Sequence, residues 1–155
     1  MLKILLPEKC GLHRKIIDRK KTQFIKIRNK VAAPYSVGMT FLLAQSYSDI
    51  PKELLPNNIN NRHWGFYNKK YVRNELLQYR IKILSCRAMK LHDITDEDIM
   101  KEGVEKVGNI FVNGITGKTY KSARRAFSSL VNEIHGKYTW RLNPHIFVYD
   151  FELVN

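Results

Sequence analysis

Apolar and polar residues alternate in several stretches of the chain, and a period of two is typical of β-strands. In residues 80–91 the apolar Ile81 and Ile83 alternate with Lys82, as expected when successive side chains point to opposite faces of a strand. The aromatic residues 147, 149 and 151 repeat in the same way near the C-terminus. The sequence therefore predicts strands at residues 2–6, 22–28, 39–47, 80–91 and 146–153, and a hairpin formed by residues 109–112 and 119–120.

Three other stretches repeat their apolar residues at helical spacing. Leu12, Ile16 and Ile17 are surrounded by Lys and Arg, which predicts a short amphipathic helix with a basic outer face. Thr95 followed by Asp98 fits the N-terminal capping pattern of a second short helix. A third helix is predicted from the apolar series Ala123, Phe127, Leu130 and Ile134, which ends before a glycine.

Short strands combined with two or three short helices indicate an α+β domain that is mainly β. A small, partly open barrel is the natural way to close so few strands. The 155 residues are close to the usual size of one domain and can bury a core. Residues 48–61 are polar, rich in asparagine and without a period, so we expect one domain, 1–155, with a surface insertion at about 48–78.

Several classes of protein are not expected. The longest purely apolar runs have only a few residues, whereas a membrane span needs roughly 20, and the N-terminus lacks the layout of a signal peptide. We therefore expect a cytoplasmic protein without a membrane partner. Cys10 and Cys86 are too few and too far apart for a disulfide framework or a metal cluster. The five histidines show no ligand spacing, so neither a metal nor another cofactor is expected.

The net charge of +13 is unevenly distributed along the chain. Residues 1–30 contain ten Lys and Arg against two acids, residues 31–92 contain nine against three, and residues 93–155 contain eight against nine. Clustered cations are the main source of sequence-independent affinity for nucleic acid. A phosphate-binding face would leave this asymmetry, although a solvated basic surface would leave it too.

Aromatic residues are interleaved with basic ones in residues 64–73. Trp64 and Tyr67 precede Lys69, Lys70 and Arg73. Aromatic rings next to phosphate-binding cations are typical of platforms on which unpaired bases stack. A half-buried loop across the mouth of a barrel would have a similar sequence.

Two segments in the last third resemble the C-terminal half of ASCH domains of the PUA-like superfamily. They are ITDEDIMKEG (residues 94–103) and WRLNPHIFVYDFELV (residues 140–154). The versions found in phages and prophages are the most similar, and the resemblance covers most of residues 15–154. It implies a pseudo-barrel of five to six mixed strands with two or three short helices.

The amidohydrolase branch of this family has a G-x-K-T-x-T-x-R motif and a later Glu that line one pocket. The resemblance places the Lys of the motif at Lys21, its first Thr at Thr22 and its Glu at Glu102. Its Gly corresponds to Arg19 and its Arg to Lys26, or to Arg28 after a slip of two residues. The second Thr, the proposed nucleophile, corresponds to Phe24.

An amide hydrolase without a metal needs a nucleophile or an activated water, a base, and a donor for the developing oxyanion. Lys21 and Glu102 supply the chemistry of the last two. Phe24 removes the obvious nucleophile, so turnover would require Thr22 or a water activated by Glu102. We therefore expect binding of a ligand more than catalysis.

The sequence predicts a nucleic-acid-binding module, with RNA as the expected partner and a pocket for a nucleobase or nucleotide. Two alternatives stay open. One is an amidohydrolase acting on an acetylated cytidine-type nucleoside, or a related RNA nuclease; the other is a phage-derived accessory protein that acts through protein contacts. The predicted binding residues are Arg14, Lys15, Arg19, Lys20, Lys21, Lys26, Arg28, Lys69, Lys70 and Arg73. The predicted pocket residues are Phe24, Trp64 and Tyr67, and the catalytic set of an enzyme would be Lys21, Thr22 and Glu102.

Overall fold

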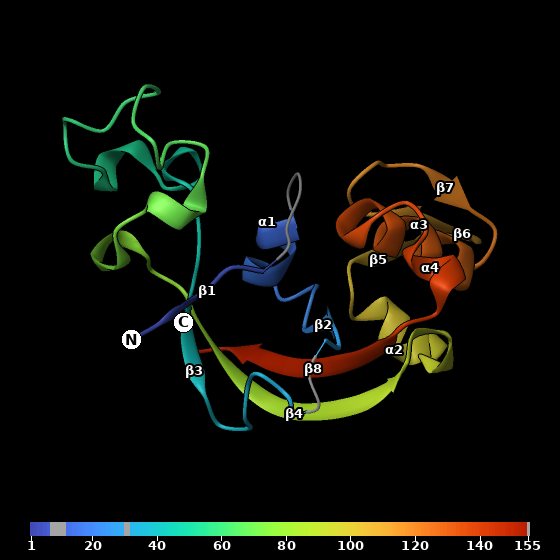
Figure 1. Cartoon of the computed structure of the whole chain (residues 1–155). Helices are drawn as coiled ribbons and strands as arrows, with labels where there is room; N and C mark the ends of the chain where they lie inside the picture. The colour runs from blue at the N-terminus through green and yellow to red at the C-terminus, as the bar shows by residue number, and fades with distance from the viewer. Residues whose placement is uncertain (7–11, 30–31, 155) are drawn as a thin grey trace.

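The computed structural model describes residues 1–6, 12–29 and 32–154 (Figure 1). The main sheet contains β1 (Lys3–Ile4), β2 (Gln23–Ile27), β3 (Thr40–Leu43), β4 (Arg80–Lys90) and β8 (His145–Leu153). A smaller sheet contains β5 (Val104–Val107), β6 (Ile110–Asn113) and β7 (Thr119–Tyr120). The α-helices are α1 (Leu12–Ile17), α2 (Asp96–Met100), α3 (Ala123–His135) and α4 (Thr139–Leu142). The predictions made for Cys10 fall outside the described residues.

The long antiparallel pair β4 and β8 forms the centre of the main sheet, whose strand order is β1-β3-β4-β8-β2 (Figure 1). The register runs from Ile81 opposite Leu153 to Lys90 opposite His145, with a bulge between Ile83 and Ser85. A bulge bends a strand and increases its twist. The β1–β3 pair is parallel and the others are antiparallel, so the sheet is mixed.

The chain that follows β1 approaches β2, the strand at the opposite edge of the main sheet. Leu5 and Leu6, which follow β1, line the same two hollows as residues of β2. A sheet whose edges approach in this way is curled into a pseudo-barrel. The predicted fold class, α+β and mainly β with five mixed strands, is thus confirmed.

Strand β8 is buried on both faces, and this divides the core in two. Phe147, Tyr149 and Phe151 pack inside the curled sheet with Ile16 of α1. The residues on the other face pack with α2 and α3 in a second cluster that includes Ile25, Phe127, Leu130, Ile146 and Val148. The apolar series predicted for α3 therefore faces the sheet, as its spacing requires.

The acidic segment before α2 forms the predicted cap. Thr95 has an extended backbone, and its side chain accepts a hydrogen bond from Asp98 N at 3.1 Å. The hairpin is also confirmed, because β6 pairs with β7 around the turn at residues 114–118. Helix α4 was not predicted, because four residues are too few to show a period. It ends at Asn143, which has a left-handed backbone.

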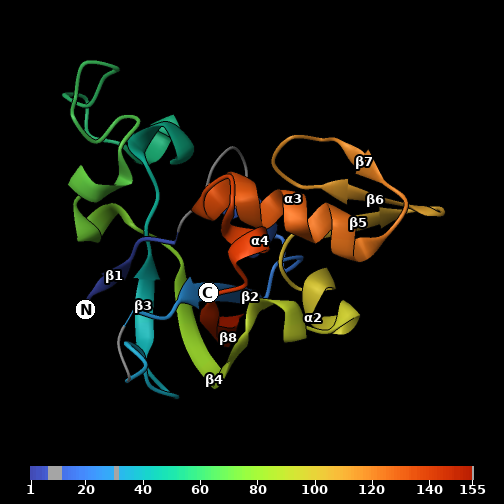
Figure 2. The same cartoon turned by 45° about the vertical axis from the view of Figure 1, so that its right-hand side comes forward.

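The chain leaves the sheet after Leu43 and returns at Arg80, so β3 is shorter than the predicted strand at residues 39–47. We call residues 44–79 the insertion lobe. It contains the short 3-10 helices η1 (Tyr47–Asp49), η2 (Lys52–Leu54), η3 (Lys69–Tyr71) and η4 (Asn74–Leu76). The lobe packs around Tyr47, Ile50, Val72 and Leu77. Figures 1 and 2 show it at one end of the main sheet, with the small sheet at the other end.

No helix among the described residues is long and apolar enough to cross a membrane.

Candidate functional site

Lys21 and Glu102 form an ion pair in the interior. Lys21 Nζ lies 3.0 Å from Glu102 Oε2 and also donates to the carbonyl oxygen of Glu102 at 3.0 Å. Lys21 follows a turn at the end of α1, and Arg19 in this turn has a φ of 59°. Glu102 follows α2. A left-handed backbone is easiest for glycine, which gives a physical reason for the Gly that the family motif has at the position of Arg19.

A network of polar side chains continues from this pair toward the surface. Gln23 donates to Glu102 Oε1 at 2.9 Å and to the carbonyl oxygen of Asp98 at 3.2 Å. Arg87 donates to both carboxylate oxygens of Asp98 at 3.0 Å and to Gln23 Oε1 at 3.2 Å. Gln23, Asp98 and Arg87 were not among the predicted site residues. The only signal in the sequence is a glutamine on an otherwise apolar face of β2.

The surroundings shift the pKa values of the two carboxyl groups in opposite directions. Burial raises the pKa of Glu102, and the nearby Lys21 ammonium and Gln23 amide oppose that rise without cancelling it. The pKa of Asp98 is lowered, because its carboxylate accepts hydrogen bonds from Arg87. Paired and hydrogen-bonded charges of this kind stabilise one arrangement of side chains more than they add net stability.

The space beside the ion pair is very small. The cavity lined by Lys21, Glu102 and Phe24 has a volume of about 20 Å³, which is room for about one water molecule. Residues of α3 close it. Phe24 is 2% exposed and stacks on Tyr149 with ring centroids 5.0 Å apart. The ring that replaces the second Thr of the motif therefore belongs to the core and leaves no room for a nucleobase.

A larger hollow lies along the edge of β2. We call it the β2-edge hollow; its volume is about 650 Å³, and its lining includes Leu5, Lys26, Asn29, Pro34, His135 and Phe147. Ligand sites of small molecules usually have 300–1,000 Å³, apolar walls and a few polar groups. Two lining residues take part in cation–π contacts with residues outside the lining: Arg28 lies 5.4 Å from the Phe147 centroid, and Lys26 lies 5.0 Å from that of Tyr35.

The backbone of β2 also contributes to this hollow. Arg28 N donates to His145 O at 2.8 Å, and Phe151 N donates to Thr22 O at 3.0 Å. Hydrogen-bonding groups of an antiparallel strand alternate between its two sides. Ile25 and Ile27, which line the hollow, therefore direct their N–H and C=O groups away from β8, toward the edge.

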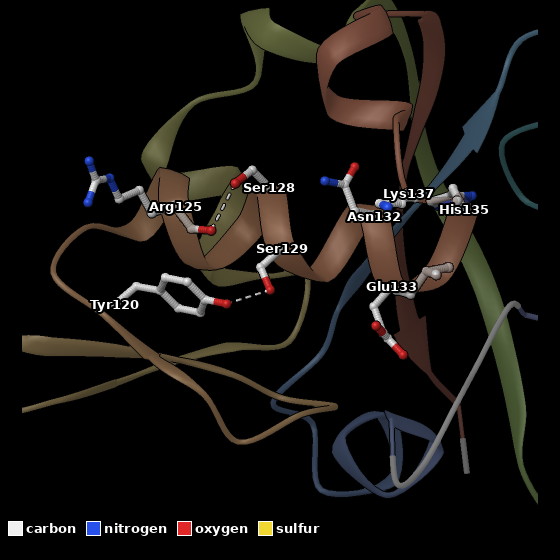
Figure 3. Close-up of a pocket in the computed structure, with 10 residues that line it drawn as sticks. Tyr120, Arg125, Ser128, Ser129, Asn132, Glu133, His135 and Lys137 are labelled. Atoms are coloured by element: carbon white, nitrogen blue, oxygen red, sulfur yellow. Dashed lines mark hydrogen bonds between the residues drawn. The ribbon is translucent and has the colours of Figure 1, made fainter.

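A third hollow, of about 870 Å³, follows one side of α3 (Figure 3). Tyr120 donates its hydroxyl hydrogen to Ser129 Oγ at 2.7 Å, and Figure 3 shows Arg125 at one end with His135 and Lys137 at the other. His135 lines all three hollows. Burial, together with the positive charge of Lys21, lowers its pKa to about 4, so the imidazole is neutral at pH 7.

The predicted basic residues occupy different surroundings. Arg14, Lys20, Lys70 and Arg73 are exposed. Lys15 Nζ lies 2.6 Å from Glu105 Oε1, and Arg19 donates to the carbonyl oxygen of Leu153 at 3.2 Å. Lys69 Nζ donates to the carbonyl oxygen of Leu6 at 2.5 Å. The binding face is therefore less continuous than the sequence predicts.

The structure does not bring the three predicted pocket residues together. Phe24 is in the core, whereas Trp64 and Tyr67 are 77% and 76% exposed on the insertion lobe. Thr22 is half-buried and its backbone joins β2 to β8. Among the described residues, no group of three or more His, Cys, Asp or Glu could hold a metal ion.

Comparison with known proteins gives one similar fold. The chain is similar to the crystal structure of an ASCH domain from Lactobacillus crispatus JV V101, with 14% identity and a TM-score of 0.43. The match covers 91% of this chain and 69% of the other. This is the family that the C-terminal motifs resemble; the phage type stays a prediction. No protein-family model and no curated protein matches the sequence.

Proposed function

We propose that this chain binds nucleic acid, with RNA as its partner, and holds one nucleotide in the β2-edge hollow. The observation that carries the proposal is the composition of that hollow. It combines the cation Lys26, the amide of Asn29 and the apolar side chains of Leu5 and Pro34 with backbone groups of β2 that point away from β8. Phosphate neutralisation and hydrogen bonding to a base edge each have a partner there, and the apolar side chains can contact the face of a base.

The buried Lys21–Glu102 pair has a structural role beside the β2-edge hollow. Lys21 and Glu102 are enclosed with room for about one water, so they do not contact the nucleotide in this conformation. Their role in the proposal is to hold the start of β2 and the end of α2 together. The amide of Asn29 and the imidazole of His135, both at the wall of the β2-edge hollow, are the neutral polar groups that face the base or the sugar.

The proposal is tested by fluorescence anisotropy with short labelled single strands and duplexes of RNA and DNA, at low and near-physiological salt. We expect saturable binding of single-stranded RNA that weakens steeply with salt, because bound phosphates release counterions. A Lys26→Ala/Asn29→Ala variant should bind at least tenfold more weakly. This corresponds to a loss of binding free energy of about 1–3 kcal/mol. Lys118→Ala, which changes an exposed lysine in the turn between β6 and β7, is the matched control. Equal affinity of the two variants would contradict the proposal.

A second function, hydrolysis of an acetylated cytidine-type nucleoside, is favoured by one observation, the contact between Lys21 and Glu102. It would require the small cavity to open, and Phe24 leaves Thr22 or a water as the nucleophile. Incubation with N4-acetylcytidine tests it directly. Turnover that is lost in Glu102→Gln, with folding intact, would establish this activity, and no turnover by the folded wild-type protein would reject it.

A further inference from the structure

The insertion lobe exposes three aromatic side chains that the site above does not use. Trp64 and Tyr67 are 77% and 76% exposed, and Tyr71 is 46% exposed. Large aromatic residues are usually more buried than this, and adjacent exposed ones indicate an interaction surface. We propose that Trp64 and Tyr71, with Arg62, Lys70 and Arg73, form a second contact surface for the same single-stranded nucleic acid. This inference rests on the proposed function and adds a second place at which the same nucleic-acid strand contacts the protein.

The buried Tyr47 packs against the turn that contains Trp64. Tyr47 is 1% exposed; its backbone N donates to Gly65 O at 2.9 Å, and its hydroxyl accepts from Arg73 N at 3.2 Å. A Cβ atom on Gly65 would lie 2.7 Å from Tyr47 Cε2, so only glycine lets the turn pack this closely. The turn that carries Trp64 is therefore fixed before any ligand arrives, which lowers the entropic cost of binding.

The exposed rings lie together and next to a cation. The rings of Trp64 and Tyr71 meet edge to face, with centroids 5.7 Å apart and planes at 76°. Lys70 Nζ is 6.0 Å from the centroid of the Tyr71 ring. An edge-to-face pair leaves a ring face available to a flat partner, and a neighbouring ammonium group suits the phosphate that follows a stacked base.

The positive charge of this surface favours a negatively charged partner. Between Glu53 and Glu75 the sequence contains four Lys and Arg and no acid. Flat apolar rings within an entirely cationic segment complement a polymer that has both planar groups and regular negative charge. A protein partner would satisfy only part of this pattern unless it were itself acidic and aromatic.

The lobe is tied to the N-terminal segment that borders the β2-edge hollow. Lys3 Nζ donates to the carbonyl oxygens of Lys70 and Val72, at 2.8 and 2.6 Å. Leu5, two residues further along the chain, lines the hollow. In the proposal one single strand contacts both places, since single-stranded sites typically cover 4–16 nucleotides.

The test compares two ligands of equal length, an oligouridylate and an abasic phosphodiester strand, for the wild-type protein and for Trp64→Ala/Tyr71→Ala. We expect the variant to bind the oligouridylate about tenfold or more weakly and the abasic strand equally well, because stacking needs bases. The control is Tyr138→Ala, which removes a 56% exposed tyrosine outside the lobe. Circular dichroism and thermal melting check that the variants fold.

Tryptophan emission gives a second measurement. The chain has two tryptophans, Trp64 and Trp140. We expect the oligouridylate to quench emission in Trp140→Phe and not in Trp64→Phe. If the wild-type protein binds the strand and Lys26→Ala/Asn29→Ala weakens it, but Trp64→Ala/Tyr71→Ala does not, the lobe surface is rejected and the proposed function stands. If the wild-type protein binds no strand even at low salt, both are rejected.

Discussion

Lys21 and Glu102 are 81 positions apart in the sequence, yet Lys21 Nζ lies 3.0 Å from Glu102 Oε2 and each side chain is only 4% exposed. The contact joins the strand that borders the β2-edge hollow to the end of the acidic helix α2. It is the link through which the N-terminal and C-terminal motifs of the sequence meet. The contribution of this ion pair to the free energy of unfolding can be measured with variants of the two residues.

Breaking the pair from either side should destabilise the fold. Lys21→Met leaves Glu102 buried without its ammonium partner, and breaking a buried pair from one side typically costs about 3–5 kcal/mol. Glu102→Gln keeps the shape and a hydrogen-bond acceptor but leaves the Lys21 ammonium buried without a counter-charge, so a loss of similar size is expected. Urea denaturation of the two variants measures both. A loss below about 1 kcal/mol for Lys21→Met would mean that the pair is not buried as described.

The cost of Lys21→Met should also depend on pH in a defined direction. Burial already raises the pKa of Glu102 in the folded protein, and loss of the Lys21 charge raises it further. A carboxyl group whose pKa is higher in the folded state favours folding most at low pH, and that contribution is lost as pH rises through the folded pKa. The difference in unfolding free energy between wild type and Lys21→Met should therefore shrink as the pH falls from 7 toward 4. A difference that grows would contradict this assignment.

His135 predicts a second pH effect. Its pKa is lowered from 6.5 to about 4 in the folded protein, so between these values the unfolded chain binds a proton that the folded chain does not. The contribution of His135 to stability is present above pH 6.5 and is lost as the pH falls toward 4, by roughly 2–3 kcal/mol. His135→Gln should remove this part of the pH dependence. Parallel unfolding curves of wild type and variant across that range would contradict the assignment.

Arg19 tests the turn that delivers Lys21. Its φ of 59° lies in the left-handed region, where a residue with a side chain is less stable than glycine by about 1–2 kcal/mol. Arg19→Gly should be tolerated despite loss of the hydrogen bond to Leu153 O, whereas Arg19→Val should be clearly less stable than Arg19→Gly. Thermal melting of the two variants makes the comparison. Equal melting temperatures would argue against the left-handed turn.

Gly65 tests the support of the insertion lobe. An added Cβ would lie 2.7 Å from Tyr47 Cε2, and overpacking of this kind costs about 1–3 kcal/mol. Hydrogen exchange should show faster exchange of lobe amides in Gly65→Ala, with the β4–β8 pair unchanged. Asn61→Ala, an exposed position in the same lobe, is the control. Uniform protection in Gly65→Ala would mean that the turn is not held by Tyr47.

The sequence predicted strands β2, β4 and β8 and helix α3 well, because their apolar residues have the period of the structure that they form. It overextended β3 and did not predict β5. It predicted the meeting of Lys21 and Glu102 through the family motif, because periodicity says nothing about contacts between distant segments. Gln23, Asp98 and Arg87 were missed since alternation does not reveal which polar side chains are paired inside. Trp64 and Phe24 were both predicted as pocket residues because both are aromatic. The structure places them apart, because residues 44–79 leave the main sheet and form the insertion lobe.

The most direct test of the proposed site is an ¹H–¹⁵N NMR titration with uridine 5′-monophosphate and then with a short RNA strand. We predict saturable shifts of the backbone amides of Ile25, Ile27 and Asn29, which border the β2-edge hollow, and no shift at Lys118. Shifts confined to the hollow beside α3 in Figure 3, or no saturable shift with either ligand, would contradict the account.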